Sequence, residues 1–422
     1  MRVLIVTSGS MGDMAPYTGL GSRLREAGHE VTVAAHDSFR PTFTGVGLAF
    51  QPLPGDMRQV LPQAHGQDGT SSGTSPRALA QLLRIARPVI AELGDGIAAA
   101  VEQTRPDAIL LSTVVAPLGY QVAEAAGVPW AGVFLQPVDP TGDFGSVLLG
   151  GRSIGAWGNR AVTATASRIT ESLYAGPVHA LRRRLGLPRE SIRALRARQN
   201  GAGHPTFHGF SPAVVPRPGD WRPQLEVVGY WWPRRPPAWT PPPTLTAFLA
   251  AGPPPVFIGF GSMAPGQGER LSAPVRAAIR SAGVRAVVQS GWAGLTIEDG
   301  EDVLRIGPVP HDWLFPRMAA VVHHAGAGTT AAGLRAGVPA VPVPVLADQP
   351  FWARRLHRLG AGTRAIPLSR LTADNLAGSL REALTNPHLA ARAAAVSAQL
   401  DRDDSTARIR QWLDGSAPAR SG

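Results

Sequence analysis

The chain has 422 residues, no cysteine and a formal net charge of +11 at pH 7. Its length favours two domains of about 200 residues each, and 44% hydrophobic residues can give both of them a core. The absence of cysteine excludes disulfides and thiolate chemistry. All 41 basic residues are arginine, scattered and with few aromatic residues among them, so we do not expect a nucleic-acid-binding protein.

The apolar runs bear on the cellular location. The longest, such as residues 3–6 and 256–260, are much shorter than the roughly 20 residues that cross a bilayer, so no transmembrane segment is expected. The first run follows neither a basic lead nor a small-residue cleavage site, which predicts a buried strand instead of a signal peptide, and a cytoplasmic protein. The positive charge leaves open a peripheral contact with an anionic membrane surface. The sequence does not decide between a monomer and a homodimer.

Apolar runs alternate with helical patterns in the first half of the chain. Predicted strands lie at residues 3–6, 31–35, 108–111 and 130–135, and predicted helices closed by a glycine lie at residues 17–27 and 120–126. This alternation predicts βαβ units and a doubly wound parallel sheet. We therefore assign residues 1–215 to an N-terminal Rossmann-like domain.

Proline accumulates between residues 216 and 254, which predicts a stiff linker. The strand and helix pattern then restarts with an apolar run that ends in Gly261-Ser262-Met263, much as the first strand ends in Gly9-Ser10-Met11. Residues 255–397 are predicted to form a second Rossmann-like domain, and residues 398–422 a C-terminal helix with a flexible tail. Two such domains imply a cleft, because ligands of parallel sheets bind beyond the carboxyl ends of the strands.

The most informative stretch follows the apolar run at residues 320–322. His324-Ala325-Gly326-Ala327-Gly328-Thr329 leads from this predicted strand into a predicted helix, and such a junction offers backbone N–H groups and a helix dipole to a phosphate. His323 and His324 are neighbours, so only one can point to the site, and His324 is the stronger candidate. Asp348 and Gln349 follow the next apolar run and suit hydroxyl groups. Phosphate and hydroxyls together suggest a nucleotide sugar.

Asp13 lies in the loop after the first strand, at or just before a predicted helix. An aspartate at this position commonly caps the helix. The alternative is a general base that removes a proton from an acceptor hydroxyl. Because a carboxylate with a reference pKa of about 4 is a weak base, it would act while the new bond forms. The residues alone leave both interpretations open.

Four further positions are candidates for binding a nucleotide. Ser262 follows the second glycine turn, which is otherwise a plain turn, while Gln289 and Trp292 follow a predicted strand, where Trp292 is otherwise a core residue. Val309 stands between two prolines, where its backbone can meet a base. No metal site is expected: His324 has no second ligand at a useful spacing, and the Asp-x-Asp of residues 401–403 opens a helix, so we interpret it as a cap.

These residues resemble the two-domain glycosyltransferases of the GT-B fold. The likeness is to the nucleotide-sugar-dependent family, of the glycosyltransferase family 1 type, that includes sterol glucosyltransferases and the antibiotic-tailoring transferases of actinomycetes. It is carried by Pro310-His311-Asp312-Trp313-Leu314-Phe315-Pro316, by His323-His324 and by Asp348-Gln349-Pro350-Phe351-Trp352, and more loosely by residues 9–16 and 28–33. The resemblance implies two Rossmann-like α/β domains, the first binding the acceptor, and a C-terminal helix that returns to the first domain.

The resemblance also implies a role for each candidate. Ligands of the donor diphosphate would be Ser262, His324, Gly326, Gly328 and Thr329. The base and ribose would be held by Trp292 and Val309, beside which we place Gln289. The sugar hydroxyls would be bound by Asp348 and Gln349. Asp13 matches the aspartate proposed as the catalytic base in the antibiotic-tailoring branch. Three positions depart from the family. Where this chain has Ala325 and Met11, the family often has glycine and arginine. Where it has Ala332, plant relatives have a glutamate, so ribose recognition must differ.

We therefore predict an inverting, metal-independent glycosyltransferase that needs no cofactor. It would move a hexose from UDP-glucose or a related UDP- or dTDP-sugar to a hydroxyl of an apolar small molecule, such as a polyketide, phenolic or sterol-like compound. Residues 59–74 and 138–159 would shape the acceptor site. Two alternatives stay open: a UDP-sugar 2-epimerase of the same fold, and a non-catalytic auxiliary partner of a glycosyltransferase. A dinucleotide oxidoreductase is disfavoured, because neither glycine turn has the Gly-x-Gly-x-x-Gly spacing with a following acid.

Overall fold

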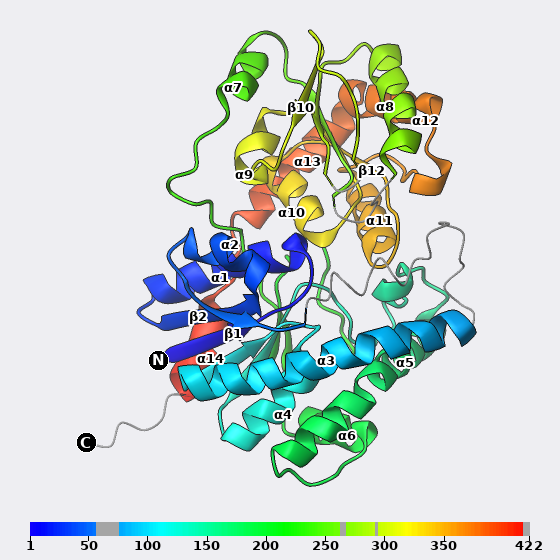
Figure 1. Cartoon of the computed structure of the whole chain (residues 1–422). Helices are drawn as coiled ribbons and strands as arrows, with labels where there is room; N and C mark the ends of the chain where they lie inside the picture. Colours follow the sequence, from blue (N-terminus) through cyan, green and yellow to red (C-terminus); the bar gives the residue numbers. More distant parts are fainter. Residues whose placement is uncertain (56–75, 262–266, 292–293, 417–422) are drawn as a thin grey trace.

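The computed structural model describes residues 1–55, 76–261, 267–291 and 294–416, and the side chains of residues 76–86 are also outside the description. It contains two lobes, each built on one parallel sheet with helices on both faces (Figure 1). Neither sheet has an antiparallel pair among the described strands. Both predicted Rossmann-like domains are therefore present as parallel-sheet domains.

The N-terminal sheet has seven strands in the order β3-β2-β1-β4-β5-β6-β7. Its strands are β1 (Arg2–Val6), β2 (Glu30–His36), β3 (Ala49–Leu53), β4 (Ala108–Leu111), β5 (Trp130–Phe134), β6 (Thr206–His208) and β7 (Leu225–Val227). Its helices are α1 (Met11–Glu26), α2 (Arg40–Thr44), α3 (Pro76–Thr104), α4 (Ala116–Ala126), α5 (Ala156–Arg184) and α6 (Ile192–Gly201).

Strand β1 shows why this sheet is buried on both faces. Its four apolar residues are almost fully buried, and because successive side chains of a strand point to opposite faces, they divide between two cores. Val3 and Ile5 pack in the core that includes residues of α1, whereas Leu4 and Val6 pack in the core that includes residues of α3 and α4. Near-continuous apolar runs are typical of such doubly covered parallel strands.

The C-terminal sheet repeats this design with five strands in the order β10-β9-β8-β11-β12. Its strands are β8 (Val256–Gly259), β9 (Ala286–Gln289), β10 (Val303–Ile306), β11 (Ala320–His323) and β12 (Ala340–Pro342). Its helices are α8 (Gly268–Ala282), α9 (His311–Leu314), α10 (Ala327–Ala336), α11 (Gln349–Leu359), α12 (Ala373–Thr385) and α13 (Pro387–Leu400). Strand β12 is short and lies at the sheet edge, where a proline is tolerated.

The strand order places a switch point in each sheet. It lies between β1 and β4 in the first domain and between β8 and β11 in the second, because the chain leaves these central strands in opposite directions. Open parallel sheets bind ligands at the carboxyl ends of the strands at this point. Asp13 lies in the first turn of α1, which follows β1, and the loop that contains His324 leaves β11, so both predicted sites start from a switch point.

The link between the lobes differs from the expected range. Strand β7 pairs with β6, so the N-terminal sheet extends into residues 216–254, which the proline content had marked as linker. A strand of three residues is too short to show a period in the sequence. The segment after β7 passes along α1, where Arg234 N donates a hydrogen bond of 2.9 Å to Thr18 Oγ1, and contains α7 (Pro243–Ala250).

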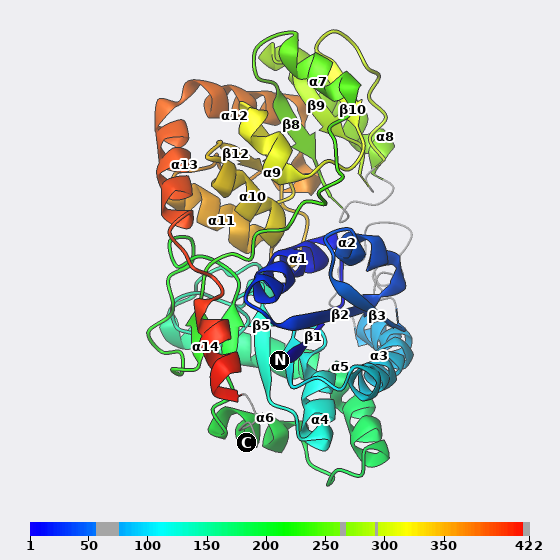
Figure 2. The same cartoon turned by 90° about the vertical axis from the view of Figure 1, so that its left-hand side faces the viewer.

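The chain returns to the first lobe after α13. Helix α14 (Ala407–Ser416) buries Ile409 and Leu413 in the core of the N-terminal domain and lies against that lobe (Figure 2). Trp231 Nε1 donates a hydrogen bond of 3.1 Å to Ser405 O, which fixes the start of this helix. The C-terminal helix thus packs where the family likeness implied, and the predicted tail beyond residue 416 lies outside the described residues. None of the described helices is both long and apolar enough to span a membrane.

The segment that follows β7 packs so closely on α1 that one position of this helix requires glycine. A Cβ added at Gly19 would overlap the carbonyl oxygen of Trp232. We expect Gly19→Ala to lower the free energy of unfolding by roughly 1–3 kcal/mol, because backbone must move to make room. Gly378→Ala in α12 is the control: nothing lies within 4 Å of its added Cβ, so it should stabilise by about 0.5–1 kcal/mol. Urea unfolding measures both, and equal effects would contradict the contact.

Candidate functional site

Two helix N-termini from different domains meet at the cleft. Helix α1 starts after its N-cap Ser10, and α10 starts after its N-cap Gly326. The two helices are in contact, and a Cβ added at Gly328 would lie 3.8 Å from Gly12 O. Since each helix N-terminus carries a partial positive charge and unpaired N–H groups, their approach creates a site for an anion. The predicted residues Gly326, Gly328 and Thr329 all lie at the start of α10.

His324 lies beside this helix start, between two glycines. A Cβ added at Gly261 would be 2.6 Å from His324 Cε1, and one added at Gly326 would overlap Nε2. Gly261 also has a φ of +62°, so the turn after β8 needs glycine for two reasons. The imidazole is thus held against backbone on two sides, and a side chain at either glycine would displace it.

The imidazole of His324 is neutral and keeps a free nitrogen. Burial lowers the pKa of His324 to about 4, so at neutral pH it offers one N–H as a hydrogen-bond donor and carries no charge. Its Nδ1 is buried, and no described residue is hydrogen-bonded to it. A buried polar atom without a partner costs about 1–3 kcal/mol, a cost that a ligand oxygen can remove.

His323 has a different role from its neighbour. It is fully buried in β11 and its Nδ1 accepts a hydrogen bond of 3.0 Å from Ala325 N. Burial, assisted by His324 and His311, lowers the pKa of His323 to about 3. Ala325 has a φ of +60°, a left-handed conformation in which its Cβ costs roughly 1–2 kcal/mol. The contact from His323 thus helps to hold the loop in the conformation that presents His324.

Asp13 is the third residue of α1 and does cap that helix. Its Oδ2 accepts hydrogen bonds of 2.9 Å from both Ser10 N and Ser10 Oγ. A Cβ added at Gly9, where φ is +140°, would be 2.5 Å from the same oxygen, so glycine makes room for the carboxylate. Burial raises the pKa of Asp13, whereas hydrogen bonds from Ser10 and from Gln136 lower it. The capping hydrogen bonds are accepted by Oδ2. The base role that the sequence suggested for Asp13 would therefore use the same carboxyl group that caps the helix.

Asp348 and Gln349 stand at the start of α11. Asp348 Oδ2 accepts a hydrogen bond of 2.9 Å from Trp352 Nε1. Burial raises the pKa of Asp348 to about 6, with a smaller contribution from the negative charge of Asp13. The two carboxylates, one from each domain, are therefore close enough to repel. Gln349 is 2% exposed, and its Oε1 accepts hydrogen bonds from Val345 N and Leu346 N, so its carbonyl oxygen stabilises the loop that carries Asp348.

The candidates for base and ribose lie at the carboxyl ends of β9 and β10. Gln289 ends β9, and its Nε2 donates a hydrogen bond of 3.3 Å to Gly307 O. The side chain of Val309 is 7% exposed and packs in the core, which leaves its backbone to contact a ligand. Ser262 and Trp292 lie outside the described residues. The residues that precede them are neighbours, since a Cβ added at Gly291 would be 3.2 Å from Gly261 O.

Two polar residues at the N-terminal switch point were not predicted. Ser112 directly follows β4, and its Oγ is buried with no hydrogen-bond partner among the described residues. Gln136 follows β5 by two residues and influences the pKa of Asp13. The available signal was a polar residue immediately after a buried strand, on the edge where parallel sheets bind ligands.

The acidic run at residues 401–404 lies between α13 and α14, so the Asp-x-Asp follows one helix and does not directly open the next. Asp401 ends α13 as its C-cap. Asp404 Oδ1 accepts hydrogen bonds from Thr406 N and Oγ1 just before α14 begins. Within the described parts of the chain, no three histidine or acidic side chains are grouped as a metal ion would need.

Two parallel-sheet domains with an anion site between their strand ends define a GT-B glycosyltransferase. Residues 3–138 match the family model described as glycosyltransferase family 28 N-terminal domain, and residues 296–412 match the C-terminal domain of erythromycin biosynthesis protein CIII-like proteins. The chain is 36% identical over 433 residues to O-mycaminosyltylonolide 6-deoxyallosyltransferase of Streptomyces fradiae, with 100% of both chains covered. The chain therefore belongs to this glycosyltransferase family and is an enzyme of that class.

Sterol glucosyltransferases are also relatives. The chain is 31% identical over 418 residues to a sterol 3-beta-glucosyltransferase of Arabidopsis thaliana, and the alignment covers 96% of this chain but 66% of that one. It is 32% identical to the sterol 3-beta-glucosyltransferase of Yarrowia lipolytica, of which it covers 28%. The chain thus corresponds to a part of these longer proteins.

Solved structures share the fold. The crystal structure of the kitacinnamycin glycotransferase superposes with a TM-score of 0.70 at 20% identity and covers 99% of both chains. The Streptomyces sp. SF2575 glycosyltransferase SsfS6, solved in complex with thymidine diphosphate, superposes with a TM-score of 0.64 at 24% identity, covering 98% of this chain and 99% of that chain. The GT-B fold predicted from the sequence is confirmed.

The raised pKa of Asp348 predicts a dependence of stability on pH. Its folded value of about 6 lies above the ordinary 3.8, so the folded state binds the proton more tightly and the free energy of unfolding falls as pH rises between these values. Asp348→Asn keeps an oxygen for Trp352 and removes the charge. We expect it to raise the free energy of unfolding by about 2–3 kcal/mol at pH 7 and by little at pH 4.

Urea unfolding at both pH values measures this difference. Asp414→Asn on the exposed surface of α14 is the matched control, and it should change stability little at either pH. A stabilisation by Asp348→Asn that is as large at pH 4 as at pH 7 would show that the carboxyl charge is not its cause.

Proposed function

We propose that the protein is an inverting glycosyltransferase that moves a hexose from a UDP- or dTDP-sugar to a hydroxyl of an apolar small molecule without a metal ion or cofactor. The observation that supports this most strongly is the contact of the α1 and α10 starts, with the neutral His324 on one side and Asp13 on the other. This arrangement joins an anion site to a carboxylate at the same cleft, as a transfer from a nucleotide sugar requires.

The donor half is built around the leaving group. The diphosphate of the donor would accept hydrogen bonds from the backbone N–H groups at the start of α10 and from His324 Nδ1, which has no partner among the described residues. As the bond between the anomeric carbon and the diphosphate oxygen breaks, negative charge grows on that oxygen. Fixed donors and a helix dipole stabilise this charge without reorganising, and this is the role that a metal ion has in other transferases.

The acceptor half supplies the proton acceptor. The acceptor oxygen attacks the anomeric carbon, its proton passes to the Asp13 carboxylate, and the electron pair of the broken bond leaves on the diphosphate. A single displacement of this kind inverts the anomeric configuration. The raised pKa of Asp13 makes it a better base than an exposed aspartate. Gln136 and the hydroxyl of Ser112 would help to position the acceptor.

The substrate class follows from chemistry at the cleft and from the relatives. The carboxylate of Asp348 at the start of α11 would bind sugar hydroxyls, which favours a hydroxylated hexose. The Streptomyces fradiae relative is named for transfer to O-mycaminosyltylonolide, and the plant and fungal relatives are named for transfer to sterols. The solved complex with thymidine diphosphate supports a dTDP-sugar. We therefore place the acceptor among polyketide, phenolic or sterol-like molecules.

Asp13→Asn separates the base from the helix cap. The asparagine oxygen can still accept the hydrogen bonds from Ser10, so α1 should remain capped while proton transfer is lost. We expect kcat to fall by roughly 10²–10⁴-fold, with little change in donor affinity. Nucleoside diphosphate release, measured over panels of UDP- and dTDP-sugars and aromatic, polyketide and sterol acceptors, tests this.

Asp414→Asn serves as the control in the same assay and should keep wild-type rates. Turnover that survives Asp13→Asn would refute its role as the base. Release that proceeds equally without any acceptor would point to a hydrolase or an epimerase instead of a transferase.

His324→Ala tests the donor half separately. Loss of a hydrogen bond to a charged phosphate costs about 1.5–3 kcal/mol, so we expect the affinity for UDP or dTDP to fall by roughly 10–150-fold. His357→Ala, an exposed histidine on α11, is the matched control and should bind the nucleotide normally. Calorimetric titration with each diphosphate gives the Kd, and an unchanged Kd in His324→Ala would remove the imidazole from the diphosphate site.

A further inference from the structure

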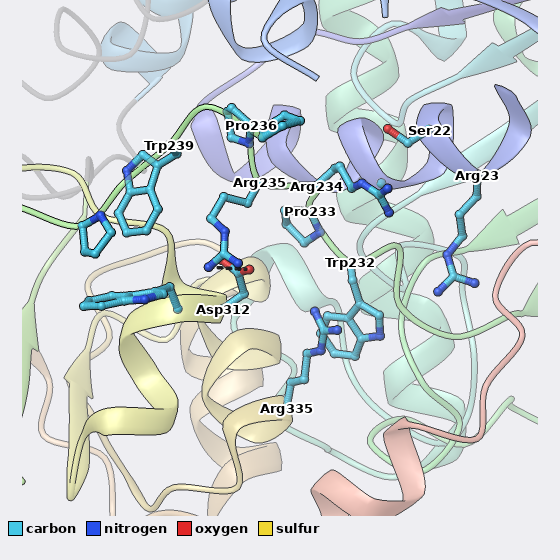
Figure 3. A pocket seen from close by; sticks show the side chains of 14 residues that line it. Ser22, Arg23, Trp232, Pro233, Arg234, Arg235, Pro236, Trp239, Asp312 and Arg335 are labelled. Atoms are coloured by element: carbon cyan, nitrogen blue, oxygen red, sulfur yellow. Dashed lines mark ion pairs between the residues drawn. The ribbon is translucent and has the colours of Figure 1, made fainter. Parts of the chain in front are cut away.

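A pocket of about 550 Å³ lies where the linker crosses between the domains, away from the cleft. Its walls are formed by Gly19, Ser22 and Arg23 of α1, by residues 232–237 with Trp239 and Pro241 of the linker, and by Asp312, Trp313 and Arg335 of the C-terminal domain (Figure 3). It falls within the volume range of small-molecule sites. We call this space the hinge pocket.

The hinge pocket touches the same two helices as the catalytic cleft, but at other turns. Ser22 lies ten residues after Gly12 in α1, which is about 15 Å along the helix axis. Arg335 lies in the last turn of α10, whose first turn forms the anion site of the cleft. A molecule in the hinge pocket would therefore contact both domains through the helices that face each other in the cleft.

The charge of the hinge pocket is strongly positive. Four arginines line it against one aspartate, a formal surplus of three positive charges. The pair of Arg235 with Asp312 is long, at 3.6 Å, and Arg234 is paired at 3.2 Å with Glu26, outside the lining. No described carboxylate forms an ion pair with Arg23 or Arg335. Guanidinium groups without a full partner suit a phosphate or carboxylate.

Three tryptophans supply the flat apolar walls. Trp239 and Trp313 meet edge to face with ring centroids 5.5 Å apart. The guanidinium of Arg335 lies 4.6 Å from the ring centre of Trp232, and that of Arg235 lies 5.6 Å from Trp239. Arg335 and Arg235 are thus held beside indole rings, and the aromatic walls offer apolar surface to a flat ligand while its acidic group meets these guanidinium groups.

We propose that the hinge pocket is a second ligand site, which binds a small organic anion made of a flat ring and a phosphate or carboxylate group. The ring lies against the tryptophans, and the acidic group accepts hydrogen bonds from Arg235 and Arg335. Because the walls come from both domains, occupation couples to their relative orientation and hence to the cleft. This site is distinct from the donor and acceptor sites and does not depend on the proposed reaction.

Phenyl phosphate is a suitable probe, since it joins a ring to a phosphate. Calorimetric titration of the full chain should give a Kd of roughly 0.1–1 mM for a ligand of this size. The double variant Arg235→Gln with Arg335→Gln should raise the Kd at least tenfold.

The controls separate this site from others. Arg189→Gln, at an exposed arginine outside the pocket, should bind phenyl phosphate like the wild type, and so should His324→Ala, which affects the donor site. Inorganic phosphate should bind at least tenfold more weakly, because it lacks the ring. The proposal is refuted by an absence of binding at 10-fold the expected Kd, by loss of binding in His324→Ala or Arg189→Gln, or by equal affinity for inorganic phosphate.

Discussion

The approach of two helix N-termini across the cleft is the constraint on which the rest of the site depends. Helices α1 and α10 come from different domains, yet a Cβ added at Gly328 would be in van der Waals contact with Gly12 O. Two partial positive charges directed at one point repel unless an anion lies between them. The cleft is thus arranged for a negatively charged group, and a diphosphate is the group that a glycosyltransferase must bind and release.

Glycine makes this geometry possible at three further positions. Gly9 leaves room for the carboxyl group of Asp13, while Gly261 and Gly326 leave room for the imidazole of His324. In each case a functional side chain is fixed against backbone, so it cannot rotate away from the cleft. The same packing buries both groups, and burial makes His324 neutral and raises the pKa of Asp13. The close packing of His324 and Asp13 therefore sets both the position and the protonation state of these two side chains.

The sequence predicted the central parts of the fold best. The apolar runs at β1, β4, β8 and β11 are buried on both faces, so their pattern is continuous and easy to identify, and the switch points follow from them. Strands β6 and β7 were missed because three residues show no period, and β7 fell among the prolines taken as linker. The sequence predicted a helix only from residue 17, whereas α1 begins at Met11, so Asp13 lies within the helix.

The residues that gather at the start of α10 could be predicted because one contiguous stretch carries them. Side-chain roles that depend on packing could not: the oxygen of Gln349 is used by the loop before α11, and the side chain of Val309 is in the core. The hinge pocket combines α1, the linker, α9 and α10, which no local pattern joins.

A crystal structure of the protein with bound UDP or dTDP tests the central claim most directly. The terminal phosphate should lie between the starts of α1 and α10, within hydrogen-bond distance of His324 Nδ1 and of backbone N–H groups in the first turn of α10. A diphosphate bound elsewhere, on surface arginines or in the hinge pocket, with His324 Nδ1 still unpaired, would contradict it.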